Sequence, residues 1–192
     1  MMKSKHVSMA HAVCPAERAR MLDNPLRSLL VRPHRLLNPY IKPGMTVLDV
    51  GCGPGFFITL LAELVGPSGH VIAADLQQEM LDIVREKLKR DNISGRVSLH
   101  KTHADSLDLT GSGYIDFTIA FHMVHEVQNP DTFFSEVYTV LKPGGLFLVS
   151  EPRGHVKKNE FDEEIVLAKK AGFTIMSDNY SLREFQVILH KA

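Results

Sequence analysis

The order of short apolar runs and amphipathic stretches after residue 45 constrains the fold more than any other feature of this sequence. Strand-like runs, rich in β-branched and aromatic residues, are expected at 46–50, 70–74, 96–100, 115–120, 146–150, 173–177 and 185–190. Apolar residues at helical spacing separate them, at 56–65, 77–91, 130–141 and 162–171. This alternation predicts an α/β fold, a doubly wound and mainly parallel sheet with helices on both faces.

The first 45 residues follow a different pattern, rich in Pro, Arg and His and without strand-like runs. We expect two or three short helices there, forming an N-terminal helical cap (1–45) on the same domain as the sheet (46–192). The segment is basic, with two acids, Glu17 and Asp23, against Lys3, Lys5, Arg18, Arg20, Arg27, Arg32, Arg35 and Lys42. A solvated helical face explains this imbalance, and so does attraction of an anionic substrate.

Composition argues against several classes of protein. The 22 Lys and Arg residues balance the 22 Asp and Glu residues, which does not favour a dedicated nucleic-acid or membrane-surface protein. Two cysteines, Cys14 and Cys52, supply neither a disulfide framework nor a paired metal site. No apolar run approaches the roughly 18 residues of a spanning helix, and no signal peptide is evident. We therefore expect a cytoplasmic protein.

A glycine-rich loop follows the first expected strand, in the segment 47–55 (VLDVGCGPG). Glycines at a strand-to-helix junction permit positive φ and close approach of a ligand, and the helix N-terminus adds unpaired N–H groups. The loop suits the carboxylate of an amino-acid-like ligand or a phosphate. It departs from the dinucleotide-binding pattern GxGxxG, because Phe56 stands where the third glycine belongs.

Carboxylates follow the next two expected strands. Asp75 comes directly after the second strand, where it could accept hydrogen bonds from a ribose diol or cap the following helix. Ala104 and Asp105 come after the third strand, where the carboxylate could accept from an adenine amino group or lie in a surface turn. Ligands of parallel sheets bind outside the carboxyl ends of the strands, so we expect these groups to lie near one another.

The chain resembles a class I S-adenosylmethionine-dependent methyltransferase of the type-11 or UbiE-like group. The features that carry this resemblance are the loop 47–55, Asp75, Ala104–Asp105, the fourth strand ending in Phe121–His122, and the run 141–145 (LKPGG). The resemblance is strong over about 43–150. It implies a Rossmann-like seven-stranded sheet ordered 3-2-1-4-5-7-6 with one antiparallel strand, S-adenosylmethionine as cofactor, and methyl transfer to a small molecule.

The resemblance also implies cofactor-binding roles by position. The methionine part would be held by Asp49, by the loop residues Gly51, Cys52, Gly53 and Gly55, and by the backbone near Phe121. The adenosine part would be held by Asp75 at the ribose, Leu76 on the adenine face, and Ala104 and Asp105 at the adenine edge.

His122 and His125 are the candidate catalytic residues, because histidine titrates in the range useful for a general base. Such a base is needed only where the acceptor loses a proton. Local hydrogen bonding within a His–Glu pair is the alternative. The run 122–126 is HxxHE rather than the zinc-binding HExxH, so no metal is expected. The (Asp/Asn)-Pro-Pro-Tyr motif of adenine- and glutamine-methylating enzymes is absent. A thiol role for Cys14 toward a soft metalloid is a further alternative.

The acceptor pocket is expected between the carboxyl edge of the sheet, the cap and the loop 151–155, which contains Arg153. The basic cap and Arg153 favour an anionic small molecule; we expect no membrane or nucleic acid as partner, and an open pocket could be completed by a second copy in a homodimer. Three other functions stay open: RNA or protein methylation, a non-catalytic methyltransferase-like binding module, and an NAD(P)-dependent oxidoreductase.

Overall fold

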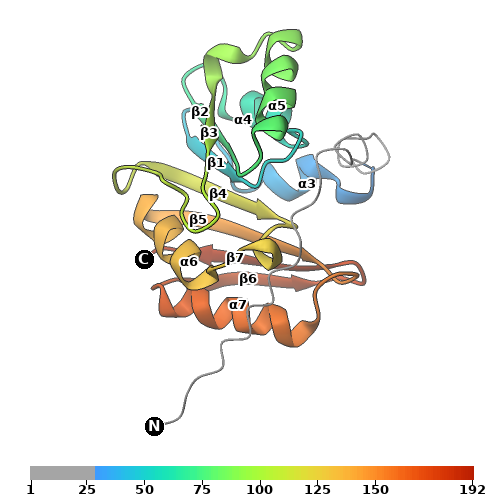
Figure 1. Ribbon diagram of the computed structural model, residues 1–192, viewed down its shortest axis with the longest axis vertical. Helices are drawn as coiled ribbons and strands as arrows, with labels where there is room; N and C mark the ends of the chain where they lie inside the picture. The colour runs from blue at the N-terminus through green and yellow to red at the C-terminus, as the bar shows by residue number, and fades with distance from the viewer. Residues whose placement is uncertain (1–28) are drawn as a thin grey trace.

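The computed structural model describes residues 29–192, which form a seven-stranded sheet in the order β3-β2-β1-β4-β5-β7-β6 (Figure 1). The strands are β1 (Thr46–Val50), β2 (His70–Asp75), β3 (Val97–Lys101), β4 (Ile115–Phe121), β5 (Leu141–Pro152), β6 (Thr174–Tyr180) and β7 (Glu184–His190). The pairs from β3 to β5 are parallel, and β7 runs antiparallel to both β5 and β6. The predicted fold class, strand order and single antiparallel strand are confirmed.

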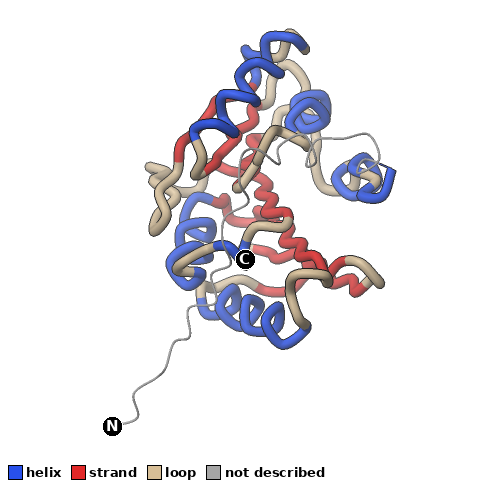
Figure 2. Tube along the Cα trace, turned by 45° about the vertical axis from the view of Figure 1, so that its right-hand side comes forward, coloured by secondary structure: helices blue, strands red, loops and turns tan. Residues whose placement is uncertain are grey.

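Helices cover both faces of the sheet, and Figure 2 shows the strands running between them. They are α3 (Pro33–Leu37), α4 (Ile58–Val65), α5 (Gln78–Arg90), α6 (Pro130–Val140) and α7 (Lys158–Lys170), with 3-10 turns η2 (Ser94–Arg96) and η3 (Val124–Glu126). One hydrophobic cluster joins α3, α4 and α5 to one face, and a second joins α6 and α7 to the other. Two cores of this kind explain why the inner strands read as unbroken apolar runs.

Several element boundaries differ from those expected, and two starts differ by four or more residues. The fifth strand begins at Leu141 rather than at 146, because Leu141 pairs with Ile115 of β4. The pairing then skips the turn residues 142–145 and resumes between Leu146 and Phe117. The helix expected at 162–171 begins at Lys158, where the Glu160 side chain accepts a hydrogen bond from the Lys157 N–H and so caps the first turn. Asn129 caps α6, its side-chain oxygen accepting from the Thr132 N–H.

The N-terminal segment joins the same core where it is described. Leu37 at the end of α3 is fully buried, and the Tyr40 ring stacks against Phe117 of β4 with centroids 6.0 Å apart. Helix α3 is one of the short helices expected in the cap. The rest of the predicted cap, residues 1–28, including Cys14 and most of the basic side chains, lies outside the described residues.

The sheet reverses its strand order between β1 and β4, which are neighbours although β2 and β3 lie between them in sequence. Crossovers on the two sides of this pair run in opposite directions and leave a crevice at the carboxyl ends of the strands. The loops after β1, β2, β3 and β4 all open onto this crevice.

Candidate active site

The loop after β1 is shaped by three glycines with positive φ: Gly51 at 66°, Gly53 at 53° and Gly55 at 82°. A Cβ added to Gly53 would meet no atom within 4 Å, so a ligand has room to approach the backbone there. A Cβ added to Gly51 would lie 2.9 Å from the Cβ and Cγ atoms of Met123, which crosses the loop from the end of β4.

Gly55 has a different position from the one its predicted cofactor role requires. A Cβ there would lie 3.1 Å from Val84 of α5, and the Gly55 carbonyl accepts a hydrogen bond of 2.7 Å from Lys87 Nζ. Gly55 therefore lets α5 pack closely behind the loop, as the third glycine of a dinucleotide-binding loop does for its helix. It does not line the cavity.

Asp75 ties the end of β2 to the glycine loop. Its Oδ2 accepts from the Gly53 N–H and its Oδ1 from the Gln77 N–H, both at 2.8 Å. The residue is only 6% exposed, and burial raises the pKa of its carboxyl against the lowering effect of these hydrogen bonds. The N-cap of α5 is Gln77, so the alternative that Asp75 caps this helix is wrong. The Asp75 carboxylate instead lines the cavity beside the glycine loop.

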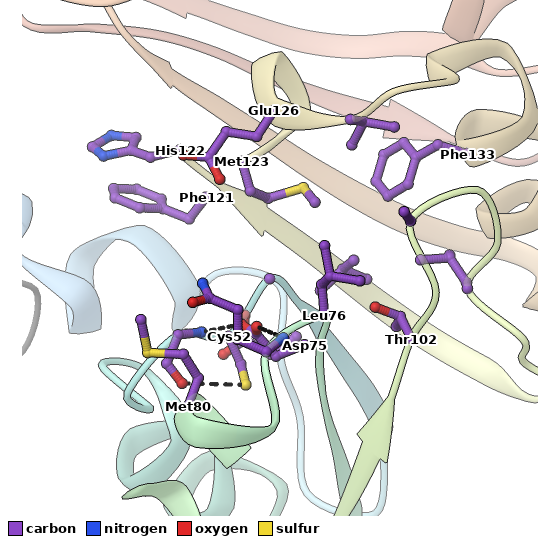
Figure 3. Close-up of a pocket in the computed structure, with 18 of the residues that line it drawn as sticks. Cys52, Asp75, Leu76, Met80, Thr102, Phe121, His122, Met123, Glu126 and Phe133 are labelled. Atoms are coloured by element: carbon purple, nitrogen blue, oxygen red, sulfur yellow. Dashed lines mark hydrogen bonds between the residues drawn. The ribbon is translucent and has the colours of Figure 1, made fainter. Parts of the chain in front are cut away.

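A cavity of about 290 Å³ opens over these loops (Figure 3). It brings together the sequence-predicted residues Asp49, Gly51, Cys52, Gly53, Asp75, Leu76, Ala104, Asp105, Phe121, His122 and His125. In Figure 3, Asp75, Leu76 and Cys52 lie on one side, and Phe121, His122 and Met123 face them from the end of β4. Residues from four strand ends therefore share one hollow.

The loop after β3 holds the exposed residues Ala104 and Asp105 at the rim of the cavity. Two hydrogen bonds fix this loop: Glu136 of α6 accepts from the Ser106 hydroxyl at 2.8 Å and from the Leu107 N–H at 2.7 Å. Thr102, buried directly after β3, also lines the cavity. Sequence reasoning missed Thr102 and Glu136; the place of Thr102 after a strand end was a usable signal.

The thiol of Cys52 is buried in the glycine loop. Burial, helped by the negative charges of Asp49 and Asp75, raises the pKa of this thiol well above its ordinary value. A neutral, buried thiol is a poor nucleophile. The structure thus places Cys52 as a small residue in the wall of the cavity.

The two candidate histidines have different surroundings. His122 adopts a φ of 61°, its imidazole stacks on Phe121 at 4.0 Å between centroids, and its Nε2 lies 2.7 Å from Glu184 Oε2. His125 is 8% exposed at its side chain, and its Nδ1 lies 2.5 Å from Glu151 Oε2. Glu151 is fully buried and also accepts from the Val124 N–H.

Charge distinguishes these histidines further. Burial lowers the pKa of the His125 imidazole, but the hydrogen bond and charge of Glu151 outweigh it, so the pKa of His125 is raised. The Glu151 side chain, which contacts His125 and accepts from the Val124 N–H, ties His125 to the start of the η3 turn, which matches the alternative of a local His–Glu pair. His122 is the more accessible of the two.

A second buried carboxyl group lies near Glu151 and was missed from the sequence. Glu164 of α7 is 8% exposed, and its Oε2 has no hydrogen-bond partner in the described part of the chain. Burial first, and then the charge of Glu151, raise the pKa of Glu164 to about 9. Glu164 is therefore protonated at neutral pH.

Pro152 at the end of β5 and His155 in the loop that follows both line the cavity, as the expected acceptor pocket requires. Arg153 does not face the cavity. Its guanidinium lies 4.9 Å from the centroid of the Phe185 ring and donates to the Ser181 carbonyl at 2.9 Å. The expectation that Arg153 attracts an anionic acceptor is not supported by this position.

Two other features are absent from residues 29–192, a metal-binding cluster and a membrane-spanning helix. No group of three or more His, Cys, Asp or Glu side chains in that range is arranged to hold a metal ion. Within the same range no helix has both the length and the apolar character needed to cross a membrane.

Comparison with known proteins gives the family. The profile of a family described as "Methyltransferase domain" matches residues 41–186, which include every strand except the end of β7. The chain belongs to this family. The family predicted from the sequence is confirmed, and with it S-adenosylmethionine as the cofactor.

The curated relatives include two proteins named "Ubiquinone/menaquinone biosynthesis C-methyltransferase UbiE". The one from Shewanella pealeana is 35% identical over 124 residues, 63% of this chain and 49% of its own length. The one from Hydrogenovibrio crunogenus is 36% identical over 111 residues, 58% of this chain and 43% of its own length. The chain thus spans about half the length of these relatives.

Solved structures share the whole fold. A SAM dependent methyltransferase from Aquifex aeolicus superposes with a TM-score of 0.85 at 26% identity, covering 94% of this chain and 100% of that one. A putative S-adenosyl-L-methionine-dependent methyltransferase from Methanococcus maripaludis gives a TM-score of 0.77 at 17% identity, over 95% and 96% of the two chains. The second likeness concerns the fold alone.

Proposed function

We propose that this chain transfers a methyl group from S-adenosylmethionine to a hydroxylated aromatic small molecule. The observation that carries the proposal is the shared cavity, in which the glycine loop, Asp75 and the loop at Ala104–Asp105 surround one hollow at the carboxyl ends of β1, β2 and β3. Open space at Gly53 and a buried carboxylate at Asp75 suit a ligand with an amino-acid end and a ribose.

Each part of the cavity has a proposed role toward the cofactor. Asp49, Cys52 and the backbone of Gly51 and Gly53 hold the methionine part, together with the backbone near Phe121. The Asp75 carboxylate accepts from the ribose hydroxyls, giving up its present bond to the loop or sharing it. Leu76 packs on the adenine face, and Ala104 and Asp105 bind the adenine edge. The cofactor supplies a methyl group already activated on a sulfonium.

The acceptor would lie on the β4 side of the cavity, where the walls are aromatic. Phe57 and Phe121 meet edge to face at 5.0 Å between ring centroids, and His122 stacks on the other side of Phe121. Such walls suit a flat ring, which gains stacking energy there. The name of the UbiE relatives, with its C-methylation in quinone biosynthesis, favours a quinol among aromatic acceptors.

A hydroxylated ring also fits the expectation of an anionic acceptor, because a ring hydroxyl that loses its proton makes the ring carbon a nucleophile. The protein then needs to align that carbon with the methyl group and to exclude water. Orientation of this kind lowers a barrier by several kcal/mol, up to about 7–11 in the best cases. A base for the hydroxyl proton adds about 10²–10⁴-fold.

The test is transfer of tritium from methyl-labelled S-adenosylmethionine to 1,4-naphthoquinol kept reduced with dithionite. We expect label in the organic extract, and its loss in Asp75→Ala; Asp178→Asn, an exposed carboxylate on β6, is the matched control. Total RNA and a mixed peptide pool serve as parallel acceptors. Label in RNA or peptide instead of the quinol contradicts the proposal, and binding without transfer to any acceptor indicates a non-catalytic module.

A further inference from the structure

A chain of polar side chains lies on the sheet beside the cavity and belongs to no cofactor contact. Gln186 of β7 donates to the Ser150 hydroxyl at 3.3 Å, and that hydroxyl lies 3.4 Å from Glu184 Oε2. The same Glu184 oxygen lies 2.7 Å from His122 Nε2. We call these four residues the His122 cluster.

The sheet fixes the cluster from two directions. Antiparallel pairing places Gln186 opposite Ser150 and Glu184 opposite Pro152, so β7 delivers Glu184 to the end of β4. Ser150 is fully buried, and its carbonyl accepts from the His122 N–H at 2.8 Å. The carboxylate and the imidazole are therefore held by the backbone of separate strands.

His122 itself is held in an unusual conformation. Its φ of 61° is in the left-handed region. Among the described non-glycine residues with positive φ, His122 is the one that lines the cavity. Such a conformation costs on the order of 1–3 kcal/mol and persists where surrounding contacts enforce it. Stacking on Phe121 then fixes the plane of the ring, so the contacts hold both the backbone and the ring of His122.

The contact with Glu184 selects one tautomer of the ring. An ionised carboxylate only accepts hydrogen bonds, so Nε2 carries the proton that it donates to Glu184. Nδ1 then carries the lone pair, and no described residue makes a hydrogen bond to it. The imidazole lines the cavity on the side where Figure 3 places Phe121.

We propose that His122 Nδ1 is the base that takes the ring-hydroxyl proton of the acceptor, and that Glu184 is the positioning residue that keeps His122 in the Nε2–H tautomer. The inference rests on the proposed function. The O–H bond breaks and its proton goes to Nδ1, while the electron pair moves into the ring. The ring carbon bonds to the methyl carbon as the methyl–sulfur bond breaks, and that electron pair stays on sulfur. The ring then loses its C–H proton to water, and the electron pair of that bond restores the aromatic ring and the negative charge on the oxygen. His122 Nδ1 returns its proton to this oxygen, so one proton is released in all and the base is regenerated.

The tautomer is measured without any acceptor, by two-bond ¹H–¹⁵N NMR of the full chain labelled at histidine, above pH 8. His122→Asn assigns the signal, since Asn tolerates positive φ. We expect Nε2–H in the wild type, a mixture of tautomers in Glu184→Ala, and Nε2–H again in Glu184→Gln, whose amide oxygen still accepts. Asp178→Asn is the matched control. An Nδ1–H wild type, or a tautomer unchanged in Glu184→Ala, overturns the inference.

Turnover of 1,4-naphthoquinol gives the second readout. Glu184→Ala is expected to lower kcat about 10–100-fold, Glu184→Gln to recover part of it, and the Kd of S-adenosylhomocysteine to stay within about twofold. If Glu184→Ala raises the Kd of S-adenosylhomocysteine by the same factor by which it lowers kcat, Glu184 has a structural role and the inference is overturned. A wild type that binds S-adenosylhomocysteine and shows Nε2–H but methylates no quinol contradicts the proposed function instead.

Discussion

Replacement of Glu164 by Gln is expected to stabilise the protein, increasingly so as pH rises. Burial and the neighbouring Glu151 charge raise the pKa of Glu164 from 4.5 to about 9. The folded chain therefore keeps this proton to a higher pH than the unfolded chain does. As a result, the free energy of unfolding falls as pH rises between about 4.5 and about 9, at up to about 1.4 kcal/mol per pH unit. Gln is neutral throughout and avoids this loss.

The magnitude follows from the same two values. At pH 7 the unfolded carboxyl has been above its pKa for about 2.5 units while the folded one is still protonated, a loss of about 3 kcal/mol. At pH 5 the loss is below about 1 kcal/mol. The advantage of Glu164→Gln should thus grow by about 2.5 kcal/mol between pH 5 and pH 7, whatever constant difference the amide introduces.

Urea unfolding followed by circular dichroism at pH 5, 6 and 7 measures this difference. Glu163→Gln, an exposed neighbour on the same helix, is the matched control. If the difference between Glu164→Gln and the wild type does not change with pH, Glu164 ionises normally in the folded protein. The reasoning about its burial beside Glu151 is then wrong.

Substitutions at the glycine loop separate stability from ligand binding. Gly51→Ala should lower the free energy of unfolding by about 2–4 kcal/mol, because the new side chain combines positive φ with a contact of 2.9 Å to Met123. Gly53→Ala should lower it by only about 1 kcal/mol but weaken S-adenosylhomocysteine binding more than tenfold. Thermal unfolding with and without the ligand checks both variants, and equal effects of the two would contradict this reasoning. In a Cys14→Ser background, Cys52 should react with iodoacetamide at pH 7 far more slowly than free cysteine, because burial keeps it a thiol. Mass spectrometry measures the rate, and a rate near that of the free amino acid would show that the loop opens.

The sequence predicted the elements and cavity residues that depend on local pattern. The glycines that follow β1, Asp75 at the end of β2 and the start of α6 at Pro130 lie where the sequence pattern placed them. The strand order came from the resemblance to class I methyltransferases, since periodicity alone does not order strands. The start of β5 was misplaced because Leu141 reads as the end of the preceding helix, and only its pairing with Ile115 of β4 makes it part of the strand.

Long-range partners were beyond the sequence. Glu184 meets His122 across 62 positions, through an antiparallel strand whose register no local pattern fixes. Glu164 reads as a polar residue of an amphipathic helix, and only the packing of α7 buries it near Glu151. Gly55 appeared to be a third ligand-binding glycine, but the position of α5 gives it a packing role.

Isothermal titration of the full chain with S-adenosylhomocysteine asks whether the crevice between β1 and β4 is an adenosyl site. One site per chain is expected, with Asp75→Ala weakening binding about 10–100-fold through loss of charge-assisted hydrogen bonds. No detectable heat at millimolar ligand, or a folded Asp75→Ala protein that binds as tightly as the wild type, would contradict the assignment of this cavity.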